Sequence, residues 1–500
     1  MLTKLHLQDY SEKISIHGLR YVLKKGAKQW EKILWMTILT VAGICILNKF
    51  YQSWQLYNHS LIQIIIEDPL FPLKEIDFPA ITVCMNSNAM YSKVKTLTEI
   101  YSNESNSKKY FENSIKAISI MRFPHFNALA PLVRSLKMEK IPPEEIRDIM
   151  LYLGPTIDDM LVKCFWRGIK YNCSDLFRRQ RSEIGFCYSF NSKTADRNSN
   201  YSDRNPPLTG EDDQLIPLRT NSAGRMSGLE LILRNMEYEN FPGKDAMTGY
   251  NVMVHNPGEF PDETMSYKAH LDINRVSQIS VSVAKVSADQ SLYWINQKDR
   301  KCTMKKSSSY LISDDLSREG NPESFCLKKC RLDVIYKFCK CIPYYSITYE
   351  DLSETCGVEH LNCLNLINVR LRNFPPPIEE SGFPDWSLPE YMNCSCPTPC
   401  SFISYTSENR KITTFNEFNI RNFSLESNHI YLDIHYKKPY VISFRRSLKY
   451  SAEELIVAFG GMASLFLGCS IMTILEVIYY TYKLLIELKK VNTIVDVTPN

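Results

Sequence analysis

A run of small residues near the carboxyl end of the chain has the composition of an ion-conduction site. The run is Gly460-Gly461-Met462-Ala463-Ser464-Leu465-Phe466-Leu467-Gly468-Cys469-Ser470, and Glu476 is the only formal charge of the apolar segment 455–482 that contains it. Small side chains let helices approach closely and leave carbonyls and hydroxyls within reach of a partly dehydrated cation. A carboxylate deep in an apolar span is costly and indicates a functional site. The alternative is a small-residue packing seam in a simple membrane anchor.

Two apolar segments are predicted to cross a bilayer and to position this run. The first covers residues 33–53 and is flanked by lysines and aromatic residues suited to a membrane interface. The second covers residues 453–482 and contains the run, and we expect one continuous helix there. A signal peptide is the alternative for the first segment, but that segment begins at residue 33 and has no small-residue cleavage site.

The charges next to the two spans predict the orientation of the chain. Basic residues precede the first span and follow the second: Lys4, Lys13, Arg20, Lys24, Lys25, Lys28, Lys32, Lys483, Lys489 and Lys490. By the positive-inside rule both termini are cytoplasmic. The predicted order is a cytoplasmic N-terminus (1–32), a transmembrane helix (33–53), an extracellular cysteine-rich domain (54–452), a second transmembrane helix (453–482) and a cytoplasmic tail (483–500).

The cysteines agree with an extracellular loop. Of the 16 cysteines, Cys45 and Cys469 lie in the predicted spans. All the others lie in the loop: Cys84, Cys164, Cys173, Cys187, Cys302, Cys326, Cys330, Cys339, Cys341, Cys356, Cys363, Cys394, Cys396 and Cys400. An even number of cysteines in an oxidising compartment predicts a disulfide framework, although spacing alone does not choose the pairing.

Sequons and charge complete the assignment to the secretory pathway. Sequons begin at Asn58, Asn103, Asn172, Asn200, Asn393 and Asn422. The third and fifth precede predicted disulfide cysteines, so we expect glycans at the other four positions only. The formal net charge of +4 is too small to indicate a nucleic-acid partner. The chain has no phosphate-binding loop, paired-cysteine zinc pattern or HExxH run, so no enzyme and no resident cofactor are expected.

The sequence of the extracellular loop predicts an α+β domain. Alternating β-branched residues predict strands at 78–84, 229–233, 250–255, 278–286 and 430–444. Helical spacing of apolar residues dominates 92–159, with helices at 110–121, 128–138 and 143–153. The polar stretch 195–225 is predicted to be a mobile loop.

An ordered series of motifs over nearly the whole chain resembles the degenerin/epithelial sodium channel family, in particular its insect pickpocket-like branch. The series includes His17-Gly18, Phe78-Pro79-Ala80-Ile81-Thr82-Val83-Cys84, His255-Asn256-Pro257-Gly258-Glu259-Phe260-Pro261, Cys326-Leu327-Lys328-Lys329-Cys330, Cys394-Ser395-Cys396-Pro397-Thr398-Pro399-Cys400 and Glu476-Val477-Ile478-Tyr479-Tyr480. Each motif is weak by itself, whereas the ordered set is specific.

The resemblance implies roles for the small-residue run. Gly468, Cys469 and Ser470 match the family's selectivity filter, although the middle position is more commonly Ala or Ser. Glu476 matches an acidic ring on the cytoplasmic side of the filter, and its alternative role is an ion pair with a lysine of a neighbouring helix. Gly460 and Gly461 would line the pore.

Two further features are implied near the ends of the spans. Acid-sensing relatives carry an acidic residue at the position of Ala458, and here Glu453 and Glu454, nearer the outer mouth, are expected to substitute in part. His17 and Gly18 match the family's gating motif, in which glycine permits a turn that other residues resist.

The implied fold has two transmembrane helices and one large disulfide-rich α+β ectodomain, in a trimer like that of acid-sensing ion channels. The implied function is an amiloride-sensitive, voltage-independent sodium channel subunit that assembles as a homo- or heterotrimer in the plasma membrane and opens to an extracellular stimulus. Sodium would be its permeant ion rather than a cofactor. The alternatives are a purinergic-type two-span channel and a non-conducting receptor or adhesion subunit.

The resemblance also implies a disulfide pairing. The seven pairs are Cys84–Cys187, Cys164–Cys173, Cys302–Cys400, Cys326–Cys396, Cys330–Cys394, Cys339–Cys363 and Cys341–Cys356. Three of these pairs run in reverse order along the chain, so we expect two antiparallel strands to be cross-linked like the rungs of a ladder.

Overall fold

The structure, a computed structural model, describes most of the chain. The described residues are 17–23, 26–59, 62–101, 105–196, 216–241, 249–263, 266–271, 276–304, 322–346, 354–373, 392, 394, 396–412 and 429–495. They divide into two compact units, which are treated separately below. The first combines 1–65, 289–300 and 446–500, and the second combines 66–288 and 301–445.

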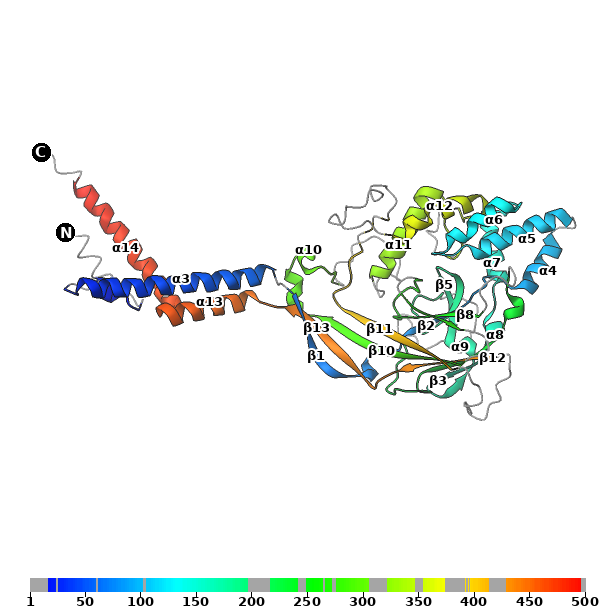
Figure 1. Cartoon of the computed structure of the whole chain (residues 1–500), viewed down its shortest axis with the longest axis horizontal. Coiled ribbons are helices and arrows are strands. Elements are labelled where there is room, and N and C mark those ends of the chain that lie inside the picture. Colours follow the sequence, from blue (N-terminus) through cyan, green and yellow to red (C-terminus); the bar gives the residue numbers. More distant parts are fainter. Residues whose placement is uncertain are drawn as a thin grey trace. The chain divides into compact units, whose positions relative to one another are not determined.

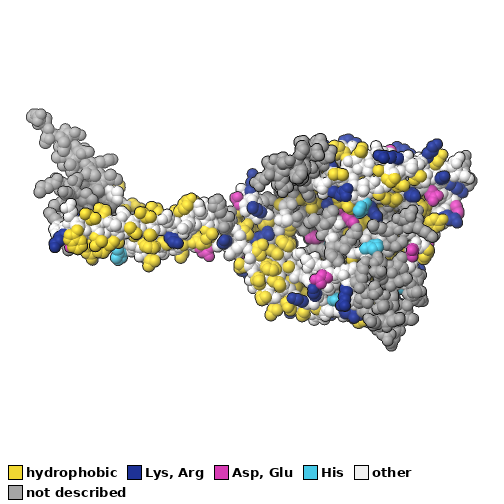
Figure 2. Space-filling model, viewed as in Figure 1, with side chains coloured by type: hydrophobic (Ala, Val, Ile, Leu, Met, Phe, Trp, Pro, Cys, Tyr) yellow, Lys and Arg dark blue, Asp and Glu magenta, His cyan; other side chains and the backbone are white. Residues whose placement is uncertain are grey.

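The first unit consists mainly of helices with apolar surfaces. Its elements are α2 (Leu19–Leu23), α3 (Gln29–His59), η4 (Gln290–Trp294), α10 (Gln297–Arg300), α13 (Ala452–Leu467) and α14 (Ile471–Val495). Within the described residues, α3 is the one continuous helix long and apolar enough to cross a membrane. It extends beyond the predicted span 33–53 at both ends. Figure 2 shows hydrophobic side chains along α3 and α13.

The expectation of one continuous second transmembrane helix is wrong. The helices α13 and α14 are separated by Gly468, Cys469 and Ser470, and they form a pair bent by 71° that is apolar enough to cross a membrane only when taken together. The bend arises because Gly468 adopts a left-handed backbone conformation, which ends an α-helix.

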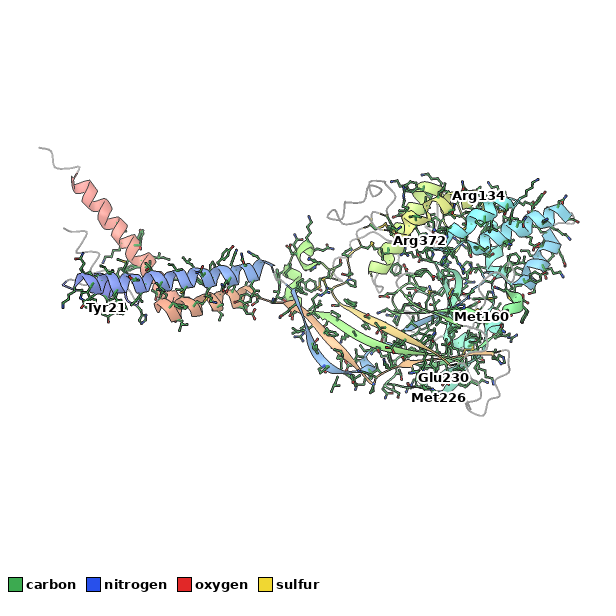
Figure 3. The ribbon with its side chains drawn as sticks, viewed as in Figure 1. Tyr21, Arg134, Met160, Met226, Glu230 and Arg372 are labelled. Atoms are coloured by element: carbon green, nitrogen blue, oxygen red, sulfur yellow. A yellow bond between two sulfur atoms is a disulfide. The ribbon has the colours of Figure 1, made fainter. Side chains whose placement is uncertain are left out.

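Aromatic contacts join the helices within this unit. The rings of Tyr21 in α2 and Trp35 in α3 stack with their centroids 4.7 Å apart, and Figure 3 shows where Tyr21 lies. Phe50 of α3 meets Phe459 of α13 edge to face at 5.1 Å. Such pairs fix which faces of the helices meet.

The second unit is built on two β-sheets (Figure 1). The larger, 8-stranded sheet has the order β1-β13-β10-β12-β7-β3-β4, with β11 also paired to β10. Its strands are β1 (Ile62–Pro72), β3 (Leu161–Trp166), β4 (Ile169–Tyr171), β7 (Leu229–Arg234), β10 (Val276–Ala288), β11 (Phe402–Ile412), β12 (His429–Tyr436) and β13 (Tyr440–Leu448). The 5-stranded sheet has the order β5-β6-β2-β8-β9. Its strands are β2 (Ala80–Met85), β5 (Phe177–Ser182), β6 (Gly185–Phe190), β8 (Tyr250–His255) and β9 (Tyr267–Leu271).

The main core lies between the sheets. Phe78 stands at its centre, with ring contacts to Trp166 at 4.8 Å, Tyr436 at 5.2 Å and Phe190 at 6.1 Å. All four residues are at most 5% exposed. Burying rings of this size contributes about 1.5–3 kcal/mol each, so this cluster holds the two sheets together.

A group of helices forms a second core in the same unit. They are α4 (Tyr91–Tyr101), α5 (Ser105–Ile120), α6 (Ala130–Ser135), α7 (Pro143–Leu153), α11 (Pro322–Cys339) and α12 (Leu361–Arg372). The buried side chains of this second core include Phe111, Met150 and Leu364 from the helices and Phe126 and Tyr344 from the segments between them. Figure 1 shows these helices on one side of the sheets. The short helices α8 (Ile157–Met160) and α9 (Cys173–Leu176) flank β3 and β5.

Most elements predicted from periodicity are present, but the predicted mobile loop includes residues that are anchored by hydrogen bonds. Helices α5, α6 and α7 and strands β2, β7, β8, β10, β12 and β13 lie within a few residues of their predicted ranges. Of the predicted mobile loop 195–225, residues 197–215 lie outside the described residues. The rest is anchored, since Phe78 N–H donates to Leu218 O at 2.9 Å and Leu218 N–H donates to Asn191 Oδ1 at 2.7 Å.

The structure forms the same seven disulfides that the resemblance implies, and Cys45 and Cys469 are free. The expected ladder of two antiparallel strands, however, is wrong. Cys326 and Cys330 lie in α11, where a spacing of four residues places both thiols on one face of a helix. The only β-pairing near Cys302 is an isolated parallel bridge between Thr303 and Pro399 within the described residues.

Candidate functional site

The break between α13 and α14 is built from local hydrogen bonds. Gly468 has φ +64° and ψ +21°. Its N–H donates to Ser464 O at 2.9 Å, and Cys469 N–H donates to Ala463 O at 3.2 Å. The bond from the left-handed Gly468 to Ser464 O is that of the αL cap motif, and the two bonds together satisfy carbonyls at the end of α13. The glycine of the predicted filter therefore ends α13.

The serine of the predicted filter begins the next helix. Ser470 Oγ accepts from Thr473 N–H at 3.3 Å, and Ser470 N–H donates to Thr473 Oγ1 at 3.1 Å. This reciprocal arrangement satisfies orphan donors at the start of α14. Ser470 is exposed, whereas Thr473 is buried. Sequence reasoning overlooked Thr473, although its hydroxyl lies three residues after the serine, as in a capping box.

The predicted gating motif lies against this break. His17 N–H donates to Leu467 O at 3.0 Å, although the two residues are far apart in the sequence. The next residue, Gly18, is buried with φ +88°, and a Cβ there would lie 3.3 Å from Leu39 Cδ2 and 3.4 Å from Trp35 Cε3. A left-handed backbone against α3 favours glycine at this position.

The His17 imidazole fills the space beside Gly468. A Cβ built on Gly468 would overlap Nδ1 and Cε1 of the His17 ring. Glycine is therefore required here twice, by the backbone conformation and by the neighbouring ring. The structure brings together two motifs that sequence reasoning placed in separate roles.

The other predicted pore residues lie on the two helices. Glu476 is half-buried in α14, and Gly460 and Gly461 are exposed in α13, where an added Cβ would meet nothing within 4 Å among the described residues. Glu454 has a structural role, since its Oε2 accepts from Ser451 N–H at 2.8 Å while its own N–H donates to Ser451 Oγ at 3.0 Å. Glu453 is exposed beside it in the first turn of α13. The Ser-x-x-Glu spacing of this capping box is visible in the sequence.

The chemistry available at the break is that of oxygen ligands. Backbone carbonyls lie where the helix is interrupted, the Ser470 hydroxyl is engaged in the cap of α14, and Cys469 adds a free, half-buried thiol. Non-helical backbone at membrane depth is tolerated where protein or a water-filled cavity surrounds it, and rings of carbonyls are how channels replace the water around a cation.

The predicted glycosylation positions lie mostly beyond what the structure describes. Asn103, Asn200 and Asn422 lie outside the described residues. Asn58 lies in the last turn of α3. These four positions stay predictions.

Comparisons with known proteins cover almost the entire chain. Residues 10–480 match the family model described as amiloride-sensitive sodium channel. Pickpocket protein 19 of Drosophila melanogaster is 24% identical over 483 residues, which cover 94% of this chain and 89% of that protein. Sodium channel protein Nach of Drosophila melanogaster is 20% identical over 512 residues, with coverages of 94% and 86%. Acid-sensing ion channel 4 of Rattus norvegicus is 21% identical over 498 residues, with coverages of 95% and 79%.

Proposed function

Because the chain belongs to the amiloride-sensitive sodium channel family, we propose that it is a pore-forming subunit of a trimeric, sodium-selective, voltage-independent channel gated by an extracellular stimulus. The observation that carries this proposal is the break at 468–470, against which His17 is held. A helix interrupted by small residues offers oxygens to a cation, which an unbroken anchor helix does not.

The proposal assigns two membrane crossings to the first unit. The first is α3, and the second is the bent pair α13 and α14. Basic residues before α3 and after the apolar part of α14 favour cytoplasmic termini in the plasma membrane, with residues 54–452 outside.

The proposed assembly follows from the small number of membrane crossings in one chain. Two crossings per subunit are too few to surround a conduction path, so related subunits are needed. Gly460 and Gly461 support this, because glycine inside a helix costs about 0.5–1 kcal/mol relative to alanine and nothing within 4 Å in the described chain requires it. We propose that these glycines allow neighbouring subunits to approach, in a homo- or heterotrimer.

The test of conduction is a bulky substitution at the break. Sodium current is recorded from cells expressing the full chain, alone and with pickpocket relatives, across a screen of pH, osmolarity, stretch and ligands. Ser470→Phe should abolish the current, because three bulky rings would meet at one constriction. Ser470→Ala is the matched control, since it leaves the constriction open, and surface biotinylation must show equal delivery.

Two outcomes contradict the proposal. Unchanged current and reversal potential in a delivered Ser470→Phe channel would remove the filter assignment. Absence of current from delivered wild-type chain, alone and with every relative, would favour a non-conducting subunit. The purinergic-type alternative loses its basis, because the family match spans residues 10–480.

The role of Glu476 is tested separately. We propose that three copies of this half-buried carboxylate concentrate cations below the filter. Glu476→Gln should lower single-channel conductance or the preference for sodium over potassium while the trimer still assembles. If conductance and permeability ratio both keep their wild-type values, Glu476 serves the packing of α14.

A further inference from the structure

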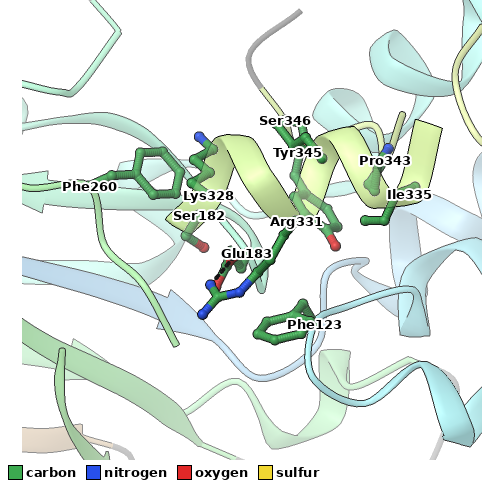
Figure 4. Close-up of a pocket in the computed structure, with 11 residues that line it drawn as sticks. Phe123, Ser182, Glu183, Phe260, Lys328, Arg331, Ile335, Pro343, Tyr345 and Ser346 are labelled. Carbon is green, nitrogen blue, oxygen red and sulfur yellow. Dashed lines mark hydrogen bonds and ion pairs between the residues drawn. The ribbon is translucent and has the colours of Figure 1, made fainter. Parts of the chain in front are cut away.

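Four charged side chains are enclosed where α11 packs against the smaller sheet. Arg331 of α11 donates from one nitrogen, Nη1, to Glu183 Oε1 at 2.7 Å and to Asp262 Oδ2 at 2.6 Å. Glu183 lies in the turn between β5 and β6, and Asp262 follows β8. All three residues are at most 6% exposed. Figure 4 shows Arg331 reaching Glu183, with the ring of Phe123 beside it.

The fourth charge, Lys328, stands about one turn before Arg331 on the same helix. Its ammonium lies over the ring of Phe260, 3.1 Å from the centroid, and is 6% exposed as a residue. Among the described residues its Nζ has no hydrogen-bond partner. Lys328, Glu183 and Arg331 line one cavity of about 20 Å³, enough for one water molecule.

Burial moves two of these groups toward neutrality. Desolvation, reinforced by the charge of Asp262 and opposed by Arg331, raises the pKa of Glu183 to about 7. Desolvation also lowers the pKa of Lys328 to about 7. Both groups therefore change charge over the same pH range. The titration of Glu183 and Lys328 therefore makes the cluster more negative by two charges as pH rises through this range.

The arginines and the phenol around the cluster keep their charge states over this pH range. From β5, Arg181 faces it and is paired with Asp196 at 3.4 Å. Arg122, in the segment after α5, interacts with Glu263, whose N–H donates to Glu183 Oε2 at 3.3 Å. Arginines stay charged throughout, and burial raises the pKa of the neighbouring Tyr345 well above its ordinary value, so that phenol stays neutral.

We propose that Glu183, Asp262, Lys328 and Arg331 form a proton-binding site that sets how tightly α11 docks on the smaller sheet, so that acidification from neutral pH tightens the docking. The site is distinct from the break at 468–470. Its link to extracellular pH rests on the orientation in the proposed function, whereas the site itself does not.

The direction of the pH effect follows from a comparison of the docked and the undocked states of α11. Undocking returns both groups to water, where Glu183 would ionise near 4.5 and Lys328 near 10.5. Between pH 4.5 and 7 the docked form binds the Glu183 proton more readily, so docking strengthens as pH falls. Between pH 7 and 10.5 the docked form releases the Lys328 proton more readily, so docking strengthens as pH rises. Docking is therefore weakest near pH 7.

Hydrogen exchange of α11 in the detergent-solubilised full-length protein tests the proposal. Protection factors, corrected for the intrinsic pH dependence of exchange, should rise about fivefold from pH 7.5 to 5.5 in the wild type. In Lys328→Met the rise should steepen to about twentyfold, because the opposing titration is gone. In Glu183→Gln the trend should reverse, to a fall of about fourfold, because only Lys328 remains.

The control is Glu144→Gln, an exposed acid on α7, which should keep the wild-type trend. Protection that does not change with pH in the wild type would overturn the proposal, even if a variant fails to fold. A Glu183→Gln protein that still gains protection on acidification would also overturn it. Because exchange is measured without current, a silent channel would contradict the proposed function and leave this result intact.

Discussion

The break at 468–470 and the cluster at Arg331 are held in opposite ways. The break is made by hydrogen bonds between residues at most six apart, plus one bond from His17, and Ser470 is exposed. The cluster joins residues 69 and 148 positions apart through buried charges. A local arrangement of backbone and capping hydrogen bonds can change by rotating a few backbone torsions, whereas a buried ion cluster resists change until a proton alters its charge. The break is therefore suited to changing conformation. The cluster is suited to setting the proton concentration at which a change occurs.

Removing the central cation should have the largest effect. Arg331→Met would leave Glu183 and Asp262 buried without their cation, and we expect the ectodomain to lose about 3–5 kcal/mol of stability. Thermal unfolding of the solubilised protein measures the loss. Adding Glu183→Gln and Asp262→Asn should recover most of it. If Arg331→Met alone is as stable as the wild type, the ion pairs contribute nothing to stability. The contrast drawn between the cluster and the break would then fail.

Acid should destabilise the ectodomain through a different buried group. Burial lowers the pKa of His255 to about 4, and its Nε2 lies 2.8 Å from Thr82 Oγ1. The folded state favours the neutral ring. The stabilisation that His255 contributes to the free energy of unfolding is therefore complete above pH 6.5, and about 3 kcal/mol of it is lost as pH falls to 4. The difference in unfolding midpoint between wild type and His255→Gln should shrink over this range. A constant difference would show that His255 does not titrate there.

Adding a methyl group at the break should cost less but should affect conduction. In Gly468→Ala the left-handed backbone costs about 1–2 kcal/mol, and the methyl group would collide with the His17 ring. We expect reduced current at normal surface delivery, measured by whole-cell recording. His17→Ala in the same chain removes the collision and should restore part of the current. If the double variant is no better than Gly468→Ala, backbone strain alone accounts for the defect.

The smallest effect is expected at the start of α14. Ser470→Ala removes a helix cap worth about 1 kcal/mol and should leave conduction in place. Thr473→Val should produce a similar loss, because it removes the other half of the reciprocal pair. Equal small shifts in unfolding midpoint would confirm that both hydroxyls serve the cap. A much larger loss of current from Ser470→Ala would assign the hydroxyl to the ion path.

Sequence reasoning succeeded where the determinant is local. Periodicity located α7 and β8, and small residues marked the run that contains Gly468. The same residue types also carried the information that the helix ends there, because glycine followed by a serine cap is a stop and start signal. The hydrophobicity of the whole segment predicts one helix only when these two residues are disregarded.

Long-range neighbours could not be predicted in this way. Nothing near His17 indicates that its N–H meets Leu467 O, and nothing near Glu183 indicates Arg331, because each contact depends on how the chain folds back. The helix around Cys326 and Cys330, by contrast, is predictable from the sequence. Cys326 and Cys330 are four apart, the spacing of one helical face, but the disulfide order suggested strands.

The nested disulfides also have a consequence for biosynthesis. Cys302–Cys400, Cys326–Cys396 and Cys330–Cys394 enclose Cys339–Cys363 and Cys341–Cys356. On the ribosome the two inner pairs emerge complete before the second cysteine of any outer pair, and each closed inner loop shortens the chain that an outer pair must span. We expect the module to oxidise from the inside outward. A premature stop between residues 364 and 393 would therefore leave the cysteines at 302, 326 and 330 unpaired, and such a product would be open to retention and degradation during secretion.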